Sequence, residues 1–245
     1  MTASEFKEEF NLRYNNALEG APGLDTYEIS TYLTIGQEQI VKKYYDVTKD
    51  PSISFESKEK ARRSISELVK DEKILLQSDS SRGLFPESKM FEISGDIMYI
   101  VMETASLSNT DTLYNNKLIK VIPTTHDELM VHYRNPFRKS NKNKAWRVDL
   151  SREGGKTTVE IVSKEDLSRY NVRYVSFPNP IIIEDLSTAL DVEGLGLTIN
   201  GKTSQAGSLL PNLTHREIID RAVELAVADY RDGTLQSRAQ MNTRI

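Results

Sequence analysis

The sequence predicts an α+β fold in which helices from both chain ends form a bundle and the middle of the chain forms a β-rich insertion. Apolar residues recur at helical spacing near both ends of the chain. Between them, from about residue 74 to residue 199, β-branched and aromatic residues and polar–apolar alternation are typical of strands. The expected parts are N-terminal helices at 1–73, the β-rich insertion with one short helix at 74–211, a bundle helix at 212–233 and an extended arm at 234–245.

The first two helices are predicted from their caps. Thr2 with Glu5, and Asp25 with Glu28, have the spacing of a capping box, in which two side chains satisfy free backbone N–H groups reciprocally. Gly36 falls in the middle of the second helix, where glycine costs up to about 1 kcal/mol relative to alanine. We therefore expect a close neighbour to pack against Gly36.

Three amphipathic helices are expected in this first part, the third over about 57–71. The side chains expected to face inward are Phe6, Phe10, Tyr14, Ala17 and Leu18 in the first, Ile29, Leu33, Ile40 and Tyr44 in the second, and Ala61, Ile65, Leu68 and Val69 in the third.

Glycine pairs mark turns in the β-rich part. Gly154-Gly155 separates two strand-like runs and predicts a hairpin, and Asn200-Gly201 is the preferred pair of a type I′ turn. Thr125 and Glu128 form another capping box, which predicts a short helix that ends before Asn135.

The C-terminal helix is expected to start within Asn212-Leu213-Thr214, where Thr214 and Glu217 form a fourth capping box, and to end at Asp232-Gly233. Its apolar stripe is wide, which indicates neighbours on more than one side. The tail that follows, 234–245, has two arginines, no acidic residue and few residues that could pack.

Composition excludes several classes of protein. The chain has 245 residues, 38% of them hydrophobic, a net charge of −4 and no cysteine. Disulfides, thiolate metal sites and cysteine nucleophiles are therefore excluded, and a uniformly basic nucleic-acid coat is not expected. The N-terminus carries acidic residues where a signal peptide would be apolar, and no apolar run approaches the length of a membrane span, so no membrane partner is expected.

No catalytic, metal or cofactor site is predicted. His126, His132 and His215 form no paired metal-binding motif, and His126 and His215 occupy helix starts, where a solvated histidine is ordinary. Glu184-Asp185 and Asp71-Glu72 could in principle hold a divalent cation for a hydrolase, but solvated loops are the favoured interpretation. We therefore expect that the protein is not an enzyme and uses no cofactor.

The segment 134–147 is the one unusual local feature of the sequence. It combines several cations, no acidic residue, the aromatic Phe137 and the only tryptophan, Trp146. Three interpretations stay open: contact with DNA phosphates, an anchor for an acidic protein partner, or a solvated loop beside the β core. The cations of this candidate patch are Arg134, Arg138, Lys139, Lys142, Lys144 and Arg147.

Several motifs together resemble a known family. They are Ala-Pro-Gly-Leu-Asp at 21–25, Tyr-Glu-Ile-Ser-Thr-Tyr-Leu-Thr at 27–34, Glu-Gln-Ile-Val at 38–41, Asn-Pro-Phe-Arg-Lys at 135–139, Ala-Trp-Arg at 145–147 and the helix 213–226. In this combination the chain resembles the head-to-tail connector, or ring, proteins of crAss-like podovirus-type bacteriophages.

The resemblance implies a virion structural protein. It implies a ring of twelve copies that connects the portal vertex to the tail, with the portal protein, other tail ring or hub proteins and further copies of itself as partners. DNA would pass through the ring lumen, and assembly would take place in the host cytoplasm. The resemblance also implies that the C-terminal arm contacts the portal, for which the candidate residues are Leu235, Arg238, Met241, Arg244 and Ile245.

A DNA-binding module is the alternative function. It would act through the basic residues Arg138, Lys139, Lys142, Lys144 and Arg147, and its affinity for duplex DNA would depend strongly on salt.

Overall fold

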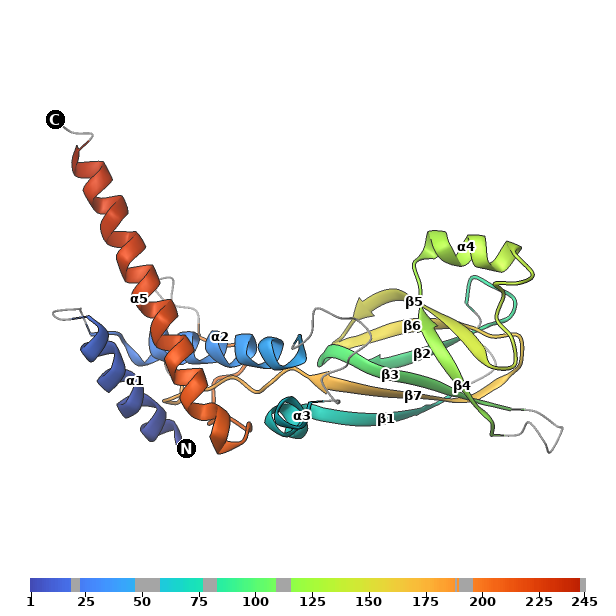
Figure 1. Ribbon diagram of the computed structural model, residues 1–245, viewed down its shortest axis with the longest axis horizontal. Coiled ribbons are helices and arrows are strands. Elements are labelled where there is room, and N and C mark those ends of the chain that lie inside the picture. Colours follow the sequence, from blue (N-terminus) through green and yellow to red (C-terminus); the bar gives the residue numbers. More distant parts are fainter. Residues whose placement is uncertain are drawn as a thin grey trace. The chain divides into compact units, whose positions relative to one another are not determined.

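The computed structural model describes residues 1–18, 23–46, 58–76, 83–108, 116–187, 189 and 196–242, with side chains described as far as Arg231. The chain divides into two compact units. One, here called the helical unit, comprises residues 1–68 and 178–245, and the other, the sheet unit, comprises 69–177. The predicted α+β class is confirmed (Figure 1).

In the helical unit, α5 (Asn212–Asn242) packs along both α1 (Ala3–Ala17) and α2 (Thr26–Tyr45) (Figure 1). The wide apolar stripe of α5 is thereby explained, because Ile218, Ile219 and Ala222 are all fully buried between these neighbours. Both N-terminal capping boxes are present, at Thr2 and Asp25.

The crossing of α2 and α5 confirms the expected close neighbour of Gly36. A Cβ atom on Gly36 would lie 3.0 Å from the carbonyl oxygen of Ile218 and 3.2 Å from the backbone nitrogen of Ala222. The two helix backbones therefore touch at this point, and the missing side chain of Gly36 is what permits it.

The third helix is shorter than predicted. α3 spans Glu59–Ile65 and passes through a single 3₁₀ turn, Ser66–Leu68, into strand β1, Val69–Leu75. The expectation of a helix to residue 71 is wrong because β1 pairs with strand β7 (Leu167–Ser176) along its whole length, and these long-range hydrogen bonds outweigh the local helical pattern.

The sheet unit contains one seven-stranded sheet in the order β1-β7-β3-β4-β5-β6-β2. The remaining strands are β2 (Ser88–Ser94), β3 (Ile97–Leu107), β4 (Leu118–Pro123), β5 (Lys144–Glu153) and β6 (Lys156–Val162). All neighbours are antiparallel except β4 and β5, which are parallel and joined through α4 (His126–Arg134).

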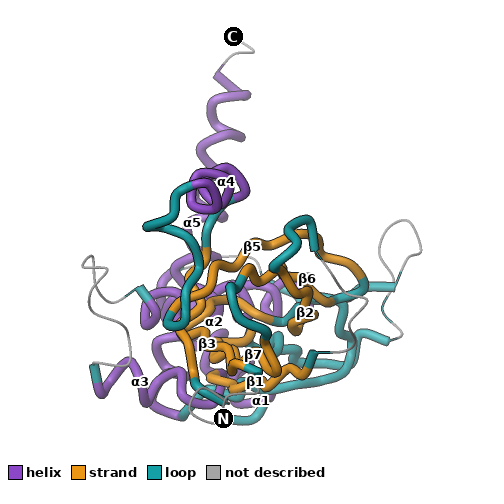
Figure 2. Tube along the Cα trace, turned by 90° about the vertical axis from the view of Figure 1, so that its right-hand side faces the viewer, coloured by secondary structure: helices purple, strands orange, loops and turns teal. Residues whose placement is uncertain are grey.

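The sheet curls around its apolar core, which includes Phe91, Ile161 and Tyr170 (Figure 2). Its two edge strands approach each other, since the backbone nitrogen of Ser94 donates to Glu72 at 3.4 Å. On the outside, Leu129 of α4 packs on Val148 and Val162 beside Trp146.

The predicted turns at the glycine pairs are confirmed. Gly154 and Gly155 have positive φ angles of 56° and 75° in the β5–β6 hairpin, and Asn200 and Gly201 have φ angles of 49° and 73° between bridging residues Ile199 and Lys202. Only glycine, asparagine and aspartate adopt this backbone region readily, which is why the sequence signal was informative.

The sequence predicted that residues 178–211 belong to the β-rich insertion. In the structure they belong instead to the helical unit. The apolar run Ile181–Ile183 is fully buried, and its backbone nitrogens donate to hydroxyl groups of α2: Ile181 to Thr34 at 3.1 Å and Ile183 to Ser30 at 3.0 Å. The β pairing described for this segment consists of isolated bridges, among them Ile182 with Ala206 and Ile199 with Lys202. Helix side chains thus supply the hydrogen bonds that a neighbouring strand would otherwise supply.

The C-terminal helix starts where the bundle helix was expected, but its predicted cap and its predicted end are wrong. The helix begins at Asn212, and the Thr214 hydroxyl donates to the carbonyl of Pro211 at 2.8 Å, so Thr214 is not the cap. The helix also continues through Gly233 to Asn242, so the backbone of the predicted arm is helical to that residue. A single glycine costs only about 1 kcal/mol in a helix, and no proline follows to end it.

Candidate interaction surfaces

The loop between α4 and β5 is held by several backbone hydrogen bonds. The side-chain oxygen of Asn135 accepts from the backbone nitrogen of Phe137 at 3.0 Å, and its carbonyl accepts from Arg138 and Lys139, each at 3.0 Å. The indole nitrogen of Trp146 donates to the carbonyl of Arg138 at 3.0 Å. These bonds fix the loop backbone from Asn135 to Lys139 against the start of β5.

The two aromatic residues of this segment have different environments. Trp146 is half-buried, and its ring stacks on His132 with 4.3 Å between the ring centroids. Phe137, by contrast, is 94% exposed. Phe137 is therefore an exposed apolar side chain on a hydrogen-bonded loop, whereas Trp146 packs with the cluster of Leu129, Val148 and Val162.

The structure removes Arg147 from the predicted basic patch. Arg147 is only 7% exposed, its Nε atom lies 3.0 Å from Oε1 of the buried Glu103, and it also pairs with Asp149. It lines a cavity of about 470 Å³ where β3 and β4 separate. The sequence predicted an exposed Arg147 because its buried ion-pair partner, Glu103, lies on β3, far away in the sequence.

The remaining predicted cations lie at the end of α4, on the loop that follows it, or at the start of β5. Lys139 lies 4.4 Å from the ring centroid of Tyr133 and 3.9 Å from a carboxylate oxygen of Glu87. Lys144 lies 5.0 Å from the ring centroid of Trp146. Arg134, Arg138 and Lys142 are exposed. The exposed positive charge next to Phe137 is thus carried mainly by arginines.

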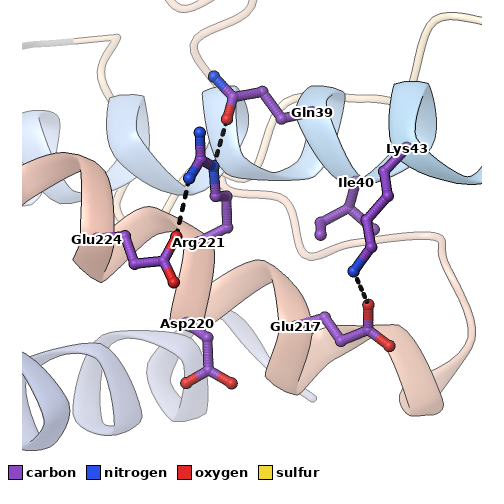
Figure 3. A pocket seen from close by; sticks show the side chains of 7 residues that line it. All are labelled: Gln39, Ile40, Lys43, Glu217, Asp220, Arg221 and Glu224. Atoms are coloured by element: carbon purple, nitrogen blue, oxygen red, sulfur yellow. Dashed lines mark hydrogen bonds and ion pairs between the residues drawn. The ribbon is translucent and has the colours of Figure 1, made fainter.

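A second candidate surface, which the sequence did not reveal, is a groove between α2 and α5 (Figure 3). Its volume is about 530 Å³. It is lined by Gln39, Ile40 and Lys43 of α2 and by Glu217, Asp220, Arg221 and Glu224 of α5. No sequence signal could have identified it, because the two sides of the groove lie more than 170 residues apart in the chain.

Glu217 is the most connected residue of the α2–α5 groove. Its carboxylate accepts from the Tyr44 hydroxyl at 2.7 Å and from Lys43 at 3.2 Å, and Lys60 lies 3.7 Å away. Burial alone would raise the pKa of Glu217, but the Tyr44 and Lys43 hydrogen bonds and the nearby positive charges lower it overall. Glu217 is therefore an ion-pair centre between helices, not the capping residue that its spacing from Thr214 predicted.

The other two carboxylates of the groove are more exposed. Asp220 pairs with Arg13 of α1 and its side chain is 62% exposed, while Glu224 pairs with Arg221 at 2.8 Å and is 64% exposed. Arg221 also donates to Gln39 across the groove (Figure 3). The outer rim of the groove thus presents carboxylate oxygens to solvent.

His215 is buried, contrary to the expectation of a solvated position. It is 2% exposed, with Nε2 2.7 Å from the carbonyl of Leu210 and its ring 5.1 Å from that of Phe6. Burial lowers the pKa of His215, and the charge of the Met1 amino group lowers it further. Its surroundings are those of a packed core histidine.

The acidic runs considered as cation sites are paired separately. Glu184 pairs with Lys7 at 2.7 Å, and Asp71 pairs with Arg173 at 3.5 Å. Within the described ranges, no group of three or more metal-ligating side chains occurs. Among the described helices, none is both long and apolar enough to cross a bilayer.

The predicted portal-contact residues lie at the end of the chain. Leu235, Arg238 and Met241 are on the helical backbone of α5, beyond the last side chain described, and Arg244 and Ile245 lie outside the described residues.

Comparison with known proteins gives one consistent family. The family model for phage tail ring protein 3/4 matches residues 1–238. Ring protein 3 of Bacteroides phage crAss001 is 33% identical over 233 residues, which cover 93% of this chain and 95% of that protein. Ring protein 4/5 of the same phage is 31% identical over 249 residues, which cover 100% of this chain and 99% of that protein. These matches confirm the resemblance to crAss-like ring proteins, and the chain belongs to the phage tail ring protein 3/4 family.

Proposed function

We propose that this chain is a subunit of a ring that joins the portal vertex of the capsid to the tail and leaves a channel for the genomic DNA. The observation that carries the proposal is similarity over nearly the whole chain to two proteins named as ring proteins of one phage. A role as a structural component of the virion, without catalysis, agrees with this similarity.

A ring of twelve identical copies is the proposed assembly, formed in the host cytoplasm and completed by other tail ring or hub proteins. Repeated contacts between two unlike surfaces of one subunit close a ring when the rotation between neighbours divides a full turn. In this proposal the helices of the helical unit form the bundle of the adaptor. Negative-stain electron microscopy of the purified full chain should show rings, and complete absence of rings at high protein concentration and in capsid extracts would contradict the proposal.

The C-terminal residues 234–245 are the proposed portal contact. Because α5 is continuous to Asn242, this contact would be made by an extension of the same helix that packs against α1 and α2. Deleting residues 234–245 should abolish co-sedimentation with isolated portal protein and leave the fold intact, since the truncated helix keeps the buried residues Ile218, Ala222 and Ala226. Unchanged co-sedimentation of the truncated chain would refute this contact.

The DNA-binding alternative depends on the cations of the 134–147 segment. Of its five residues, Arg147 is buried against Glu103, and Lys139 and Lys144 lie over aromatic rings. This arrangement favours the ring function over a dedicated DNA-binding module. Duplex affinity that falls strongly when Lys139, Lys142 and Lys144 are neutralised together would support the alternative.

A further inference from the structure

The outer face of strands β1, β7, β3 and β4 carries cations that lie mostly outside the 134–147 segment. Successive side chains of a strand point to opposite faces of a sheet. At one level of the sheet, each of these strands points one residue into the apolar core: Ile74, Tyr170, Ala105 and Ile119. Residues that alternate with such core residues lie on the outer face. The cations of this outer face, here called the strand face, are Lys73 of β1, Arg169 and Arg173 of β7, Lys120 of β4 and Lys144 of β5.

The register of the sheet places three of these cations in one row. Across the sheet, Lys73 lies opposite Asn171, which is followed in the same row by Thr104, Lys120 and Lys144. The Asn171 amide donates to the Thr104 hydroxyl at 3.3 Å, so these two side chains share one face. With about 4.8 Å between neighbouring strands, the row is about 19 Å wide.

Few carboxylates balance the strand face. Along β1, β7, β3, β4 and the start of β5, the only acidic residue that points outward is Asp71, and it pairs with Arg173 at 3.5 Å. The acidic start of α4 lies beyond the end of β4, where Glu128 accepts a hydrogen bond from the Thr124 hydroxyl at 3.1 Å. With Arg173 balanced by Asp71, the other cations of the strand face remain in excess over the outward carboxylates of these strands.

Within the sheet unit, α4 covers a different part of the sheet. It packs over β5 and β6, and Figure 1 shows it on that side. Lys73 and Lys120 are exposed, and Met102, which lies opposite Arg173 on the strand face, is 54% exposed. Solvent therefore reaches the row of cations.

The composition of the strand face fits nucleic acid better than protein. Lysine is depleted at protein interfaces, where aromatic residues and arginine dominate the binding energy. Phosphate groups, by contrast, are contacted by lysine and arginine together with asparagine and threonine, and the central row combines lysines with Asn171 and Thr104. The row of about 19 Å is also wider than the major groove of B-DNA, which is about 12 Å wide, so the strand face cannot enter the groove to read bases.

We propose that the strand face contacts the phosphates of duplex DNA in the channel of the ring, without reading the base sequence. The inference rests on the proposed ring function, because a ring of identical copies turns the same weak surface of every subunit toward one duplex. About 19 Å of duplex axis carries about eleven phosphate charges, so the excess cations of one copy balance only a part of them. Sequence-independent contacts of this kind let the duplex slide, which a genome channel requires.

The salt dependence of duplex binding tests the strand face. A full-length variant, the strand-face variant, carries Lys73→Gln, Lys120→Gln and Arg169→Gln, and its binding to a short fluorescent duplex is measured by anisotropy between about 50 and 200 mM salt. Each neutralised phosphate contributes about −0.9 to the slope of log affinity against log salt, so the slope should become shallower by about 2.7. Over this rise in salt, the fold loss of affinity should be about 40 times larger for the parent than for the variant.

A matched control separates position from net charge. The helical-unit variant carries Lys42→Gln, Arg62→Gln and Arg216→Gln, which remove three exposed cations from the helical unit. Its net charge changes by the same amount as that of the strand-face variant, but its slope should stay that of the parent.

A smaller variant guards against a folding defect. Arg169 is partly buried, whereas Lys73 and Lys120 are exposed. The double variant Lys73→Gln, Lys120→Gln should therefore keep the circular dichroism spectrum of the parent and make the slope shallower by about 1.8.

Several results would overturn the inference. They are a parent chain that binds no duplex at low salt, a strand-face variant with the slope of the parent, or an equal change of slope in the helical-unit variant. Loss of rings in the strand-face variant at an unchanged slope would make the strand face a contact between copies. Neutralising Lys139, Lys142 and Lys144 should change the slope by only about 0.9, because Lys144 alone belongs to the strand face. A larger change there, with an unchanged strand-face variant, would assign DNA to the 134–147 segment.

The inference and the ring function can fail separately. Rings seen by electron microscopy for a parent chain that binds no duplex would overturn the inference and leave the ring function standing. The expected change of slope in a chain that never forms rings would support the phosphate contact and count against the ring.

Discussion

Replacing Arg147 by methionine should strongly lower the stability of the sheet unit. The same replacement would have little effect on stability if Arg147 were the exposed cation that the sequence predicted. The guanidinium and the Glu103 carboxylate are both almost fully buried and lie 3.0 Å apart. Removing one partner of such a pair costs about 3–5 kcal/mol because it leaves the other charge uncompensated in the interior. The burial that already raises the pKa of Glu103 would then act without the opposing charge of Arg147. We expect Arg147→Met to lower the free energy of unfolding by about 3 kcal/mol or more.

Urea unfolding followed by tryptophan fluorescence measures this loss, because the single tryptophan, Trp146, lies in the sheet unit. Adding Glu103→Leu to Arg147→Met should recover most of the loss, since no buried charge remains unpaired. Recovery should be incomplete, because Tyr170, whose hydroxyl is buried beside Glu103, loses its polar neighbour.

The matched control is Arg138→Met, which makes the same substitution at an exposed arginine and should change stability by less than about 0.5 kcal/mol. The reasoning is refuted if Arg147→Met costs less than about 1 kcal/mol, or if the double variant is no more stable than the single one.

Two further substitutions test the helical unit. Gly36→Ala should destabilise the protein by about 1 kcal/mol in thermal unfolding, because the new Cβ would lie 3.0 Å from the Ile218 carbonyl oxygen. This overpacking outweighs the gain in helix propensity. A raised melting temperature would contradict the reasoning, since it would mean that α2 and α5 can move apart at little cost. His215 should make stability fall as pH drops below about 6.5, because burial lowers its folded-state pKa and the unfolded chain then takes up a proton that the folded chain excludes. His215→Gln should flatten the dependence between about pH 7 and pH 5, and an unchanged slope in urea titrations at several pH values would contradict this assignment.

Local features of the structure were predictable from sequence because they depend on residues a few positions apart. The capping boxes at Thr2 and Asp25 and the left-handed turn at Gly154-Gly155 need no tertiary partner. The inward face of α2 followed from helical periodicity, and Gly36 could be flagged because glycine in a helix is unfavourable unless something approaches closely.

The errors concern elements whose state depends on distant residues. β1 resembles the continuation of a helix until it meets β7, and Ile181–Ile183 resembles a strand until the hydroxyls of α2 hydrogen-bond its backbone. Arg147 has the sequence context of a patch cation, and only the strand that carries Glu103 shows that it is buried. Local propensity competes with these contacts at about 1 kcal/mol per residue or less, so it decides the outcome only where tertiary contacts are weak.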